Sequence, residues 1–526
     1  MRRFTRANWW MCSSGNNEAR PLPVNTNTFF SAVHRRGAGL GLLAALAALA
    51  GGCTVGPDYV RPVVSATEHY TSEAQAAATV TAEGRSQAFI AGAAVPADWW
   101  RRFGSAQLDA VVRQAITNNP TLQAAEASLR ESQDSLHAGY GVYYPHLEAN
   151  LGASRERVAS TQNGGQTPGR IFNLITESGT ISYALDVFGG ARRTVESLRA
   201  QADYQRYERE AAWLALTANV VNTCIARAAY AGQIQATEEL IGLEAEQLDL
   251  LGAQVRAGTL DYASLLSQRS LIAANRALLA PLAQEVGRAE HLLATLEGVA
   301  PALAVWPDFD LTGLVLPADL PLSLPSELIH QRPDILAAEA QMAAASAKIG
   351  VATAAMYPSF NISGTYGTAG SSFGNLSALA AASGQFWSIG PAVTMPVFQG
   401  TSLWYGRKAA QEASRQAQAV YRETVLAAFA QVADALTALQ HDAEGLQAQT
   451  AARTAATEAL ALVRVNYRAG RVGYAEVLTA DGQFHQATVA WLQAVGQRQQ
   501  DTVGLFAALG GGWWNRDAEA GKGGGR

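Results

Sequence analysis

The longest pattern in the chain is a spacing of apolar residues that is typical of long helices. Residues 190–256 and 400–468 contain no proline, and each stretch would measure about 100 Å as a helix. Within them, apolar side chains recur at alternating intervals of four and three residues, which predicts a coiled-coil seam. The seam residues are Val425, Phe429, Val432, Leu436, Leu439, Ala443 and Leu446, with Leu214, Ala218, Val221, Ile225 and Ala228 in the earlier stretch. Gly258 and Gly470 are expected to end these helices at turns, after which return helices begin.

A second pattern alternates apolar with small polar residues and predicts four β-strands. It fits an outer-membrane strand, with lipid on one side and water on the other, although a half-buried soluble sheet would give the same alternation. The segments 156–176 and 368–385, rich in Gly, Ser and Asn, join the two strands of each pair and favour the external face of a barrel. The apolar positions are Leu147, Ala149, Leu151 and Ala153; Ile181, Tyr183, Leu185 and Val187; Phe360, Ile362 and Tyr366; and Trp387, Ile389, Val393, Met395 and Val397.

The chain also repeats itself at an offset of 210 to 213 residues. Each copy should hold a shorter helix that a proline opens and a Tyr-Pro pair closes, then two strands, a long helix and a return helix. The matching pairs are Asn119-Pro120 with Arg332-Pro333, Tyr144-Pro145 with Tyr357-Pro358, Val187-Phe188 with Val397-Phe398, Arg256-Ala257-Gly258 with Arg468-Ala469-Gly470, and Tyr262-Ala263 with Tyr474-Ala475.

These patterns divide the chain into six parts. We expect an N-terminal extension with a lipoprotein signal peptide (1–52), a lipidated N-terminal segment (53–110), a first repeat (111–300), a linker (301–325), a second repeat (326–512) and a disordered C-terminal tail (513–526).

Four strands are too few to close a membrane barrel, and lipid does not tolerate open sheet edges. The chain must therefore pool its strands with identical copies. Eight strands fill their own interior with side chains, so the small polar face favours at least three copies and an open lumen. The expected fold is a mixed α/β membrane protein: a trimeric, twelve-stranded transmembrane β-barrel, four strands per chain, continued by a coiled-coil helical tube with an internal two-fold repeat.

The N-terminal region carries the marks of a secretory signal. The basic residues His34-Arg35-Arg36 precede an apolar run at 37–50 that is too short to cross a bilayer. The sequence before Cys53 resembles a lipobox, except that Leu49 stands four residues before the cysteine rather than three. Cys53 is therefore the predicted lipidation site, with an ordinary secreted start as the alternative; Thr54, in place of aspartate, favours the outer membrane. After Cys53 no run of 18 apolar residues occurs, so we expect strands rather than helices to span the membrane.

The composition and the motifs of the chain argue against several classes of function. The formal net charge of -5 over 526 residues gives no sign of a nucleic-acid partner. The chain has three cysteines without a CxxC pair, and its eight histidines are scattered singly. There is no phosphate-binding glycine loop and no zinc or nucleophile motif. We therefore expect no enzyme activity, no catalytic residue, no metal and no cofactor beyond the lipid on Cys53; Cys224 should be a small core residue.

Several motifs resemble the TolC-like outer-membrane efflux proteins, in particular their OprM/NodT lipoprotein branch. They are Cys53-Thr54-Val55-Gly56-Pro57-Asp58-Tyr59-Val60-Arg61-Pro62, Trp99-Trp100-Arg101-Arg102-Phe103-Gly104, and Arg332-Pro333-Asp334-Ile335 with Ala338-Glu339. The resemblance implies a homotrimer in the outer membrane that docks a periplasmic adaptor and an inner-membrane, proton-driven RND transporter. It implies an exit duct for drugs or other small toxic molecules.

In this family the tunnel closes at the turns between the long helices and their return helices. By position, the resemblance implies gate candidates at Tyr467 and Glu476, which match a tyrosine and an acidic residue of the TolC gate. Val472 stands where TolC has an arginine, and Thr479 and Ser264 stand where it has aspartates, so the TolC salt-bridge lock is not reproduced. Other gate candidates are Asp261, Arg468 and Arg471, which could equally be solvated helix ends.

Two alternatives remain open from the sequence. An exit duct of a type I system for secreted polypeptides would share the layout, and so would a soluble periplasmic coiled-coil scaffold without a pore. Lipidation and the Trp99-Trp100 segment favour the efflux duct.

Overall fold

A computed structural model describes residues 54–62, 69–72, 75–158, 170–307, 309–370 and 384–516. The chain divides into two units, Met1–Gly52 and Cys53–Arg526, and all described residues belong to the second. Cys53 and the predicted signal segment lie outside the described residues, so these predictions stay predictions.

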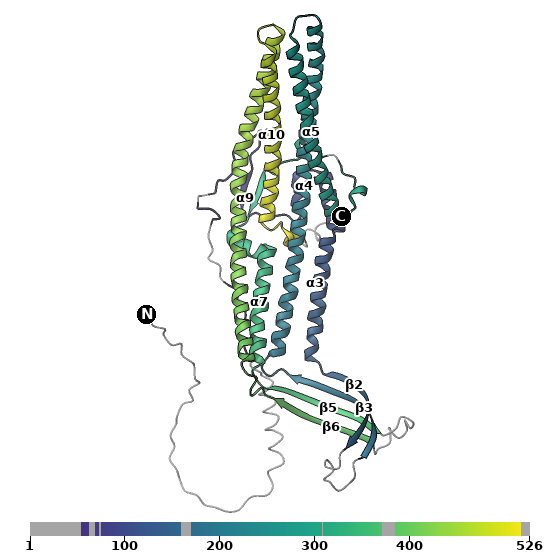
Figure 1. Cartoon of the computed structure of the whole chain (residues 1–526). Coiled ribbons are helices and arrows are strands. Elements are labelled where there is room, and N and C mark those ends of the chain that lie inside the picture. Colours follow the sequence, from purple (N-terminus) through teal and green to yellow (C-terminus); the bar gives the residue numbers. More distant parts are fainter. Residues whose placement is uncertain are drawn as a thin grey trace, which may run out of the picture. The chain divides into compact units, whose positions relative to one another are not determined.

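Two long helices run through the protein as the heptad pattern predicts (Figure 1). Helix α4 spans Gly190–Arg256 and α9 spans Ser402–Arg468, each with 67 residues. The return helices are α5 (Tyr262–Leu296) and α10 (Tyr474–Ala508), each with 35 residues. Gly258 and Gly470 have φ angles of +74° and +68°, a conformation that favours glycine, and they end the long helices where the sequence predicts.

The predicted seams are buried inside the single chain. Val432, Leu436 and Leu439 on α9 are at most 1 % exposed, and Val221 and Ile225 on α4 are fully covered. Cys224 lies in the same core, as predicted, and burial raises the pKa of its thiol to about 12. The seams therefore stabilise the single chain.

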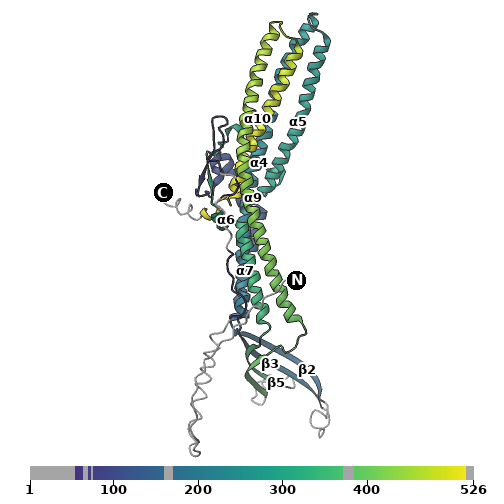
Figure 2. The ribbon, with the colours of Figure 1, turned by 90° about the vertical axis from the view of Figure 1, so that its left-hand side faces the viewer.

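Two shorter helices lie beside the long ones, at the end of the bundle that carries the four-stranded sheet (Figure 1). These are α3 (Pro120–Gly139) and α7 (Pro333–Ala354), each with proline at its first turn, and α7 is seen from a second side in Figure 2. The side chain of Asn119 caps α3 by accepting a hydrogen bond from the Leu122 amide at 2.9 Å, as predicted. A 3-10 turn, η2 (Tyr140–Tyr143), follows α3 before the chain enters the sheet.

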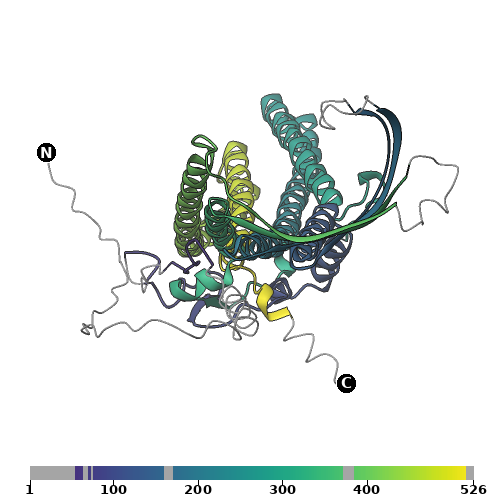
Figure 3. The ribbon, with the colours of Figure 1, turned by 90° about the horizontal axis from the view of Figure 1, so that it is seen from below.

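The four predicted strands form one antiparallel sheet in the order β2-β3-β5-β6. They are β2 (His146–Val158), β3 (Arg170–Leu185), β5 (Ser359–Gly370) and β6 (Gln385–Thr394). Seen from below, the sheet curves beneath the helices (Figure 3).

Two details of the predicted strands were wrong. The strands extend further into the expected loops 156–176 and 368–385, because backbone pairing continues through polar residues such as Glu156. In the other direction, Val187, Met395 and Val397 lie beyond the strand ends, where the chain turns toward α4 and α9.

A compact midsection packs around the long helices. Trp99 is fully buried and stacks on Phe506 of α10 at a centroid distance of 5.3 Å. The predicted disordered tail starts later than 513, since the Trp513 indole donates to the Gln331 carbonyl at 2.8 Å. The elements here are β1 (Ala88–Ala91) paired in parallel with β4 (Asp319–Leu322), η1 (Trp99–Phe103), α2 (Ala106–Asn118), η4 (Pro301–Leu303), η5 (Leu311–Gly313), α6 (Pro325–Gln331) and η7 (Trp513–Asn515).

None of the helices among the described residues is both long and apolar enough to cross a bilayer.

Candidate functional site

The two helix turns meet in an apolar cluster at the tip of the bundle, the end opposite the sheet (Figure 1). Its buried members come from three helices: Leu251 of α4, Leu265 of α5, and Tyr474 and Val477 of α10. Tyr467 of the fourth helix, α9, packs against these residues, and the centroid of its ring lies 5.5 Å from that of the Tyr474 ring. The tip thus joins two hairpins, α4–α5 and α9–α10, that are more than 200 residues apart in sequence.

Two tyrosine hydrogen bonds tie the hairpins together across this cluster. The hydroxyl of Tyr467 donates to Oε1 of Gln254 on α4 at 3.1 Å. The hydroxyl of Tyr474 donates to Oε1 of Gln268 on α5, and Gln268 in turn donates to the backbone carbonyl of Glu244 at 2.9 Å. Burial raises the pKa of both tyrosines, so both hydroxyls keep their protons and act as donors.

Below the cluster, two carboxyl groups are buried between the hairpins. Asp481 of α10 is fully covered and pairs with Arg464 of α9 at 2.8 Å. Glu244 of α4 is 1 % exposed, and its Oε1 accepts a hydrogen bond from Asn275 of α5 at 2.8 Å. One oxygen of each carboxyl, Oε2 of Glu244 and Oδ2 of Asp481, has no hydrogen-bond partner in the described structure.

Desolvation raises the pKa of both groups, because burial penalises a charged carboxylate. Asn275 opposes this shift at Glu244, and the negative charge of Asp481 adds to it. At Asp481 the Arg464 guanidinium opposes the shift by charge and by hydrogen bond. Among the described residues, Asp481 therefore pairs with a guanidinium, whereas the carboxyl group of Glu244 has a neutral amide as its only side-chain partner.

The structure places the predicted gate residues at the tip but brings only one of them into the network. Tyr467 is half-buried and bonds to Gln254, whereas Glu476, Arg468 and Arg471 are exposed. Asp261 accepts a hydrogen bond from Ser264 within its own turn, at 2.6 Å. Among the described residues, Arg468 and Arg471 form no ion pair.

Sequence reasoning missed the buried polar residues at the tip, which are Glu244, Gln268, Asn275, Arg464, Tyr474 and Asp481. Tyr474 stands in the repeated Arg-Ala-Gly…Tyr-Ala motif, which was the one available signal. The others look like ordinary polar residues of a helix, because their partners lie on other helices.

At the opposite end, the sheet has two chemically different faces. Leu147, Ile181, Gly364 and Ile389 form one row across all four strands, and Leu147 and Ile389 are 77 % and 74 % exposed. The next row lies on the other face and consists of Glu148, Thr180, Thr365 and Ser388. The hydroxyls of Thr180 and Thr365 lie 3.1 Å apart within that row. In these rows one face therefore offers large apolar side chains to its surroundings, and the other offers polar ones, most of them small.

Comparison with known proteins identifies the family. The model of the family described as "Outer membrane efflux protein" matches residues 111–299 and 324–511, which together make up more than half of the chain. The chain belongs to the outer membrane efflux protein family. This efflux protein is accordingly a component of the outer membrane that serves as an exit channel, and the family is one of ducts rather than enzymes.

Relatives and solved structures agree with this assignment. The efflux protein is 29% identical over 419 residues to the pyoverdine export outer membrane protein OpmQ of Pseudomonas putida, covering 79% of this chain and 88% of OpmQ. It is 28% identical over 478 residues to the outer membrane protein OprJ of Pseudomonas aeruginosa, covering 90% of this chain and 96% of OprJ. The outer-membrane channel OprN superposes with a TM-score of 0.78 at 25% identity, covering 88% of this chain and 100% of OprN. The relatives favour efflux over the alternative of polypeptide secretion.

Proposed function

We propose that three copies of this chain pool their sheets into one twelve-stranded barrel in the outer membrane. The observation that carries the proposal is the sheet, whose one face exposes large apolar side chains while its other face is small and polar. β2 and β6 are its outer strands, and unpaired strand edges are costly in lipid. Pairing of β6 with β2 of the next copy gives the backbone groups of both edges their hydrogen-bond partners.

We further propose that the chain consists of two copies of one structural unit. Both halves follow the order short helix, two strands, long helix and return helix, with equal lengths of 67 and 35 residues for the last two. Three such chains give six similar units around the pore. The long helices then continue the barrel as a hollow tube into the periplasm. In this division, 53–110 is the lipidated segment, 111–300 and 326–512 are the repeats, and 301–325 is the linker.

The proposed pump is tripartite. The channel docks a periplasmic adaptor and an inner-membrane RND transporter, and Cys53 carries a lipid that anchors the chain to the outer membrane. Relatives are named for pyoverdine export (OpmQ), cation efflux (CusC of Escherichia coli) and toluene efflux (TtgC of Pseudomonas putida). We propose passive conduction of drugs or other small toxic molecules, with cargo chosen by the transporter.

We propose that the tip is the gate and that the described arrangement is its closed state. The tyrosine hydrogen bonds of Tyr467 and Tyr474 hold the α9–α10 hairpin against the α4–α5 hairpin. Opening separates the two hairpins and exposes the buried carboxyl groups to water. The exposed candidates Glu476, Arg468, Arg471 and Asp261 act at the rim, where neighbouring copies approach.

Planar-bilayer recording tests this function. Purified full-length protein should form ion-conducting channels, and a variant with both tyrosines replaced by phenylalanine should conduct more. Protein that inserts into bilayers but never conducts would contradict the proposal of a pore.

A further inference from the structure

The residues that directly follow Cys53 are fastened to the junction between the sheet and the helices. We call residues 54–62 the strap. The Val55 amide donates to the backbone carbonyl of Phe188 at 3.1 Å, between the end of β3 and the start of α4. Thr54 lies beside Gly189, so closely that a Cβ at Gly189 would come within 2.7 Å of the Thr54 methyl group. The strap therefore begins at the N-terminus of α4.

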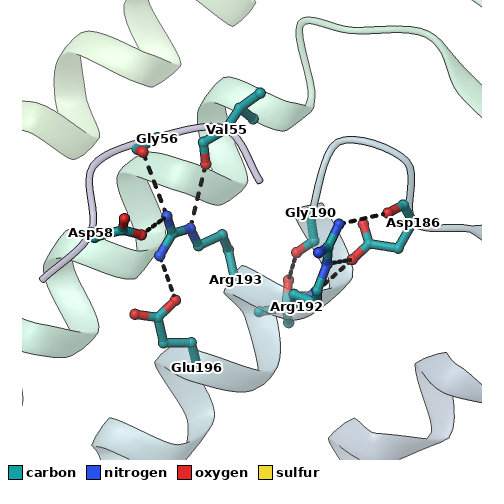
Figure 4. A network of polar contacts seen from close by, with 9 residues as sticks. Val55, Gly56, Asp58, Asp186, Gly190, Arg192, Arg193 and Glu196 are labelled. Carbon is teal, nitrogen blue, oxygen red and sulfur yellow. Dashed lines mark hydrogen bonds and ion pairs between the residues drawn. The ribbon is translucent and has the colours of Figure 1, made fainter. Parts of the chain in front are cut away.

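Arg193 of α4 holds this first part of the strap (Figure 4). Its side chain is only 4 % exposed, and its guanidinium binds Asp58 at 2.6 Å and Glu196 at 2.7 Å. It also reaches the carbonyls of Val55 and Gly56 at 3.4 and 3.5 Å. These two carbonyl contacts are long, so the ion pair with Asp58 is the shortest of the contacts between Arg193 and the strap.

A close backbone approach fixes the position of the strap along α7. Gly56 has a φ of +95°, and a Cβ there would lie 2.5 Å from the Cα of Gly350. A Cβ on Gly350 would lie 2.6 Å from the Arg193 side chain. Glycine is thus required at both positions where the strap, α7 and Arg193 meet. If the strap were shifted by one residue along α7, a side chain would fall into this close backbone contact.

A second attachment lies further along α7. Arg61 binds Glu339 through both carboxylate oxygens at 2.6 and 2.7 Å, and the Tyr59 hydroxyl donates to the same carboxylate at 3.2 Å. The five residue steps from Gly56 to Arg61 span about 16 Å when extended. The eleven residues from Gly350 back to Glu339 rise by about the same length in a helix. The strap therefore runs extended along α7 between two fixed points.

We propose that Arg193 is a positioning residue for the lipid anchor. The proposed lipid site, Cys53, directly precedes Thr54 in the sequence, and Thr54 packs at the start of α4. The acyl chains then enter the membrane beside the strand ends at a fixed depth, in contrast to a lipid on a flexible linker. This inference rests on the proposed lipidation of Cys53 and on the proposed membrane sheet.

Photo-crosslinking from the anchor itself tests the proposal. Cells supplied with a diazirine analogue of palmitate should place the label on Cys53, and irradiation of membranes should yield adducts on the strand ends next to the junction. In Arg193→Gln these adducts should fall at least about threefold, while adducts with lipid increase. Arg199→Gln is the matched control, because Arg199 lies on the same helix and bonds only to Tyr140 among the hydrogen bonds described.

Asp58→Asn provides the same test without a change in the helix core. The Asp58 side chain is 89 % exposed, so its replacement weakens the link from the strap's side only. Hydrogen exchange of the Val55 amide should accelerate about tenfold in both variants. Unchanged adducts and unchanged Val55 protection in both variants would overturn the proposal, even if thermal stability fell.

A different result would count against the lipidation instead. If no label enters wild-type protein, Cys53 is not acylated, and the anchor role of Arg193 falls with it. The Val55 exchange rates then still report whether Arg193 holds the strap. The two failures are therefore distinguishable.

Discussion

Replacing Glu244 by glutamine should hold the tip of this channel closed at neutral and alkaline pH. Glu244 is buried, and the hydrogen bond from Asn275 reaches only one of its two oxygens. Glutamine retains that acceptor and replaces the unpartnered Oε2 by a neutral amide, so it removes the buried charge and its repulsion by the negative charge of Asp481.

The magnitude of the shift toward the closed state follows from Oε2 of Glu244, which has no hydrogen-bond partner in the described structure. A buried polar group without a partner costs about 1–3 kcal/mol, and more when it is charged. If the substitution recovers about 1–2 kcal/mol of this, the ratio of closed to open channels rises about 5- to 30-fold.

The sign of the pH dependence follows from the same burial. Burial raises the pKa of Glu244 in the closed tip, while in an open tip water restores the ordinary value. The closed state thus binds the proton more tightly: its extra stability is present in acid and is lost as pH rises through the raised pKa. His485 acts in the opposite direction, because burial lowers the pKa of its imidazole. Glu244→Gln should remove the contribution of Glu244 and leave that of Asp481, whose pKa burial also raises.

Planar-bilayer recordings between pH 5 and 8 measure this directly. Open probability of the wild-type channel should contain a component that rises with pH, and Glu244→Gln should reduce that component and open less at pH 8. Glu246→Gln, an exposed position on the same helix, should behave like wild type. A Glu244→Gln channel that opens more readily than wild type, or whose pH response equals that of wild type, would show that the charge of Glu244 does not oppose closure.

Three further predictions follow from other parts of the structure. Tyr474→Phe leaves the buried Oε1 of Gln268 without its donor, at a cost of about 1–3 kcal/mol, and should raise basal conductance in bilayer recordings. Burial and a neighbouring carboxyl raise the pKa of Asp442 to about 7, so the stability of the folded protein falls as pH rises through that value. Asp442→Asn should therefore have a higher melting temperature than wild type at pH 8 but not at pH 5. Ile389→Lys, on the apolar face of β6, should reduce the amount of protein in outer-membrane fractions, since lysine facing lipid costs about 2–4 kcal/mol. Ser388→Lys, on the polar face, should not reduce it, and equal losses in the two variants would contradict the assignment of the faces.

The sequence predicted the helical part of the fold closely because the limits of the helices depend on local signals. Gly258 and Gly470 end α4 and α9 at residues where the required φ is positive, and the absence of proline before them allows helices of that length. Asn119 caps α3 through its own side chain. Such signals need no knowledge of the tertiary structure.

The strand ends and the tip network could not be predicted in the same way. Glu156 belongs to β2 because Phe172 pairs with it, which its own polarity does not indicate. Gln268 and Tyr474 become partners only when two hairpins 206 residues apart pack together. Glu476 was assigned by its match to the resembling family, and Asp261, Arg468 and Arg471 by their charge at the turns, whereas burial decides which groups interact.

Native mass spectrometry of the full-length protein in lipid nanodiscs measures how many chains share one barrel. We expect particles that contain three copies of the chain, because pooled sheets give the edges of β2 and β6 hydrogen-bond partners. Particles with a single membrane-inserted chain would rule out a shared barrel.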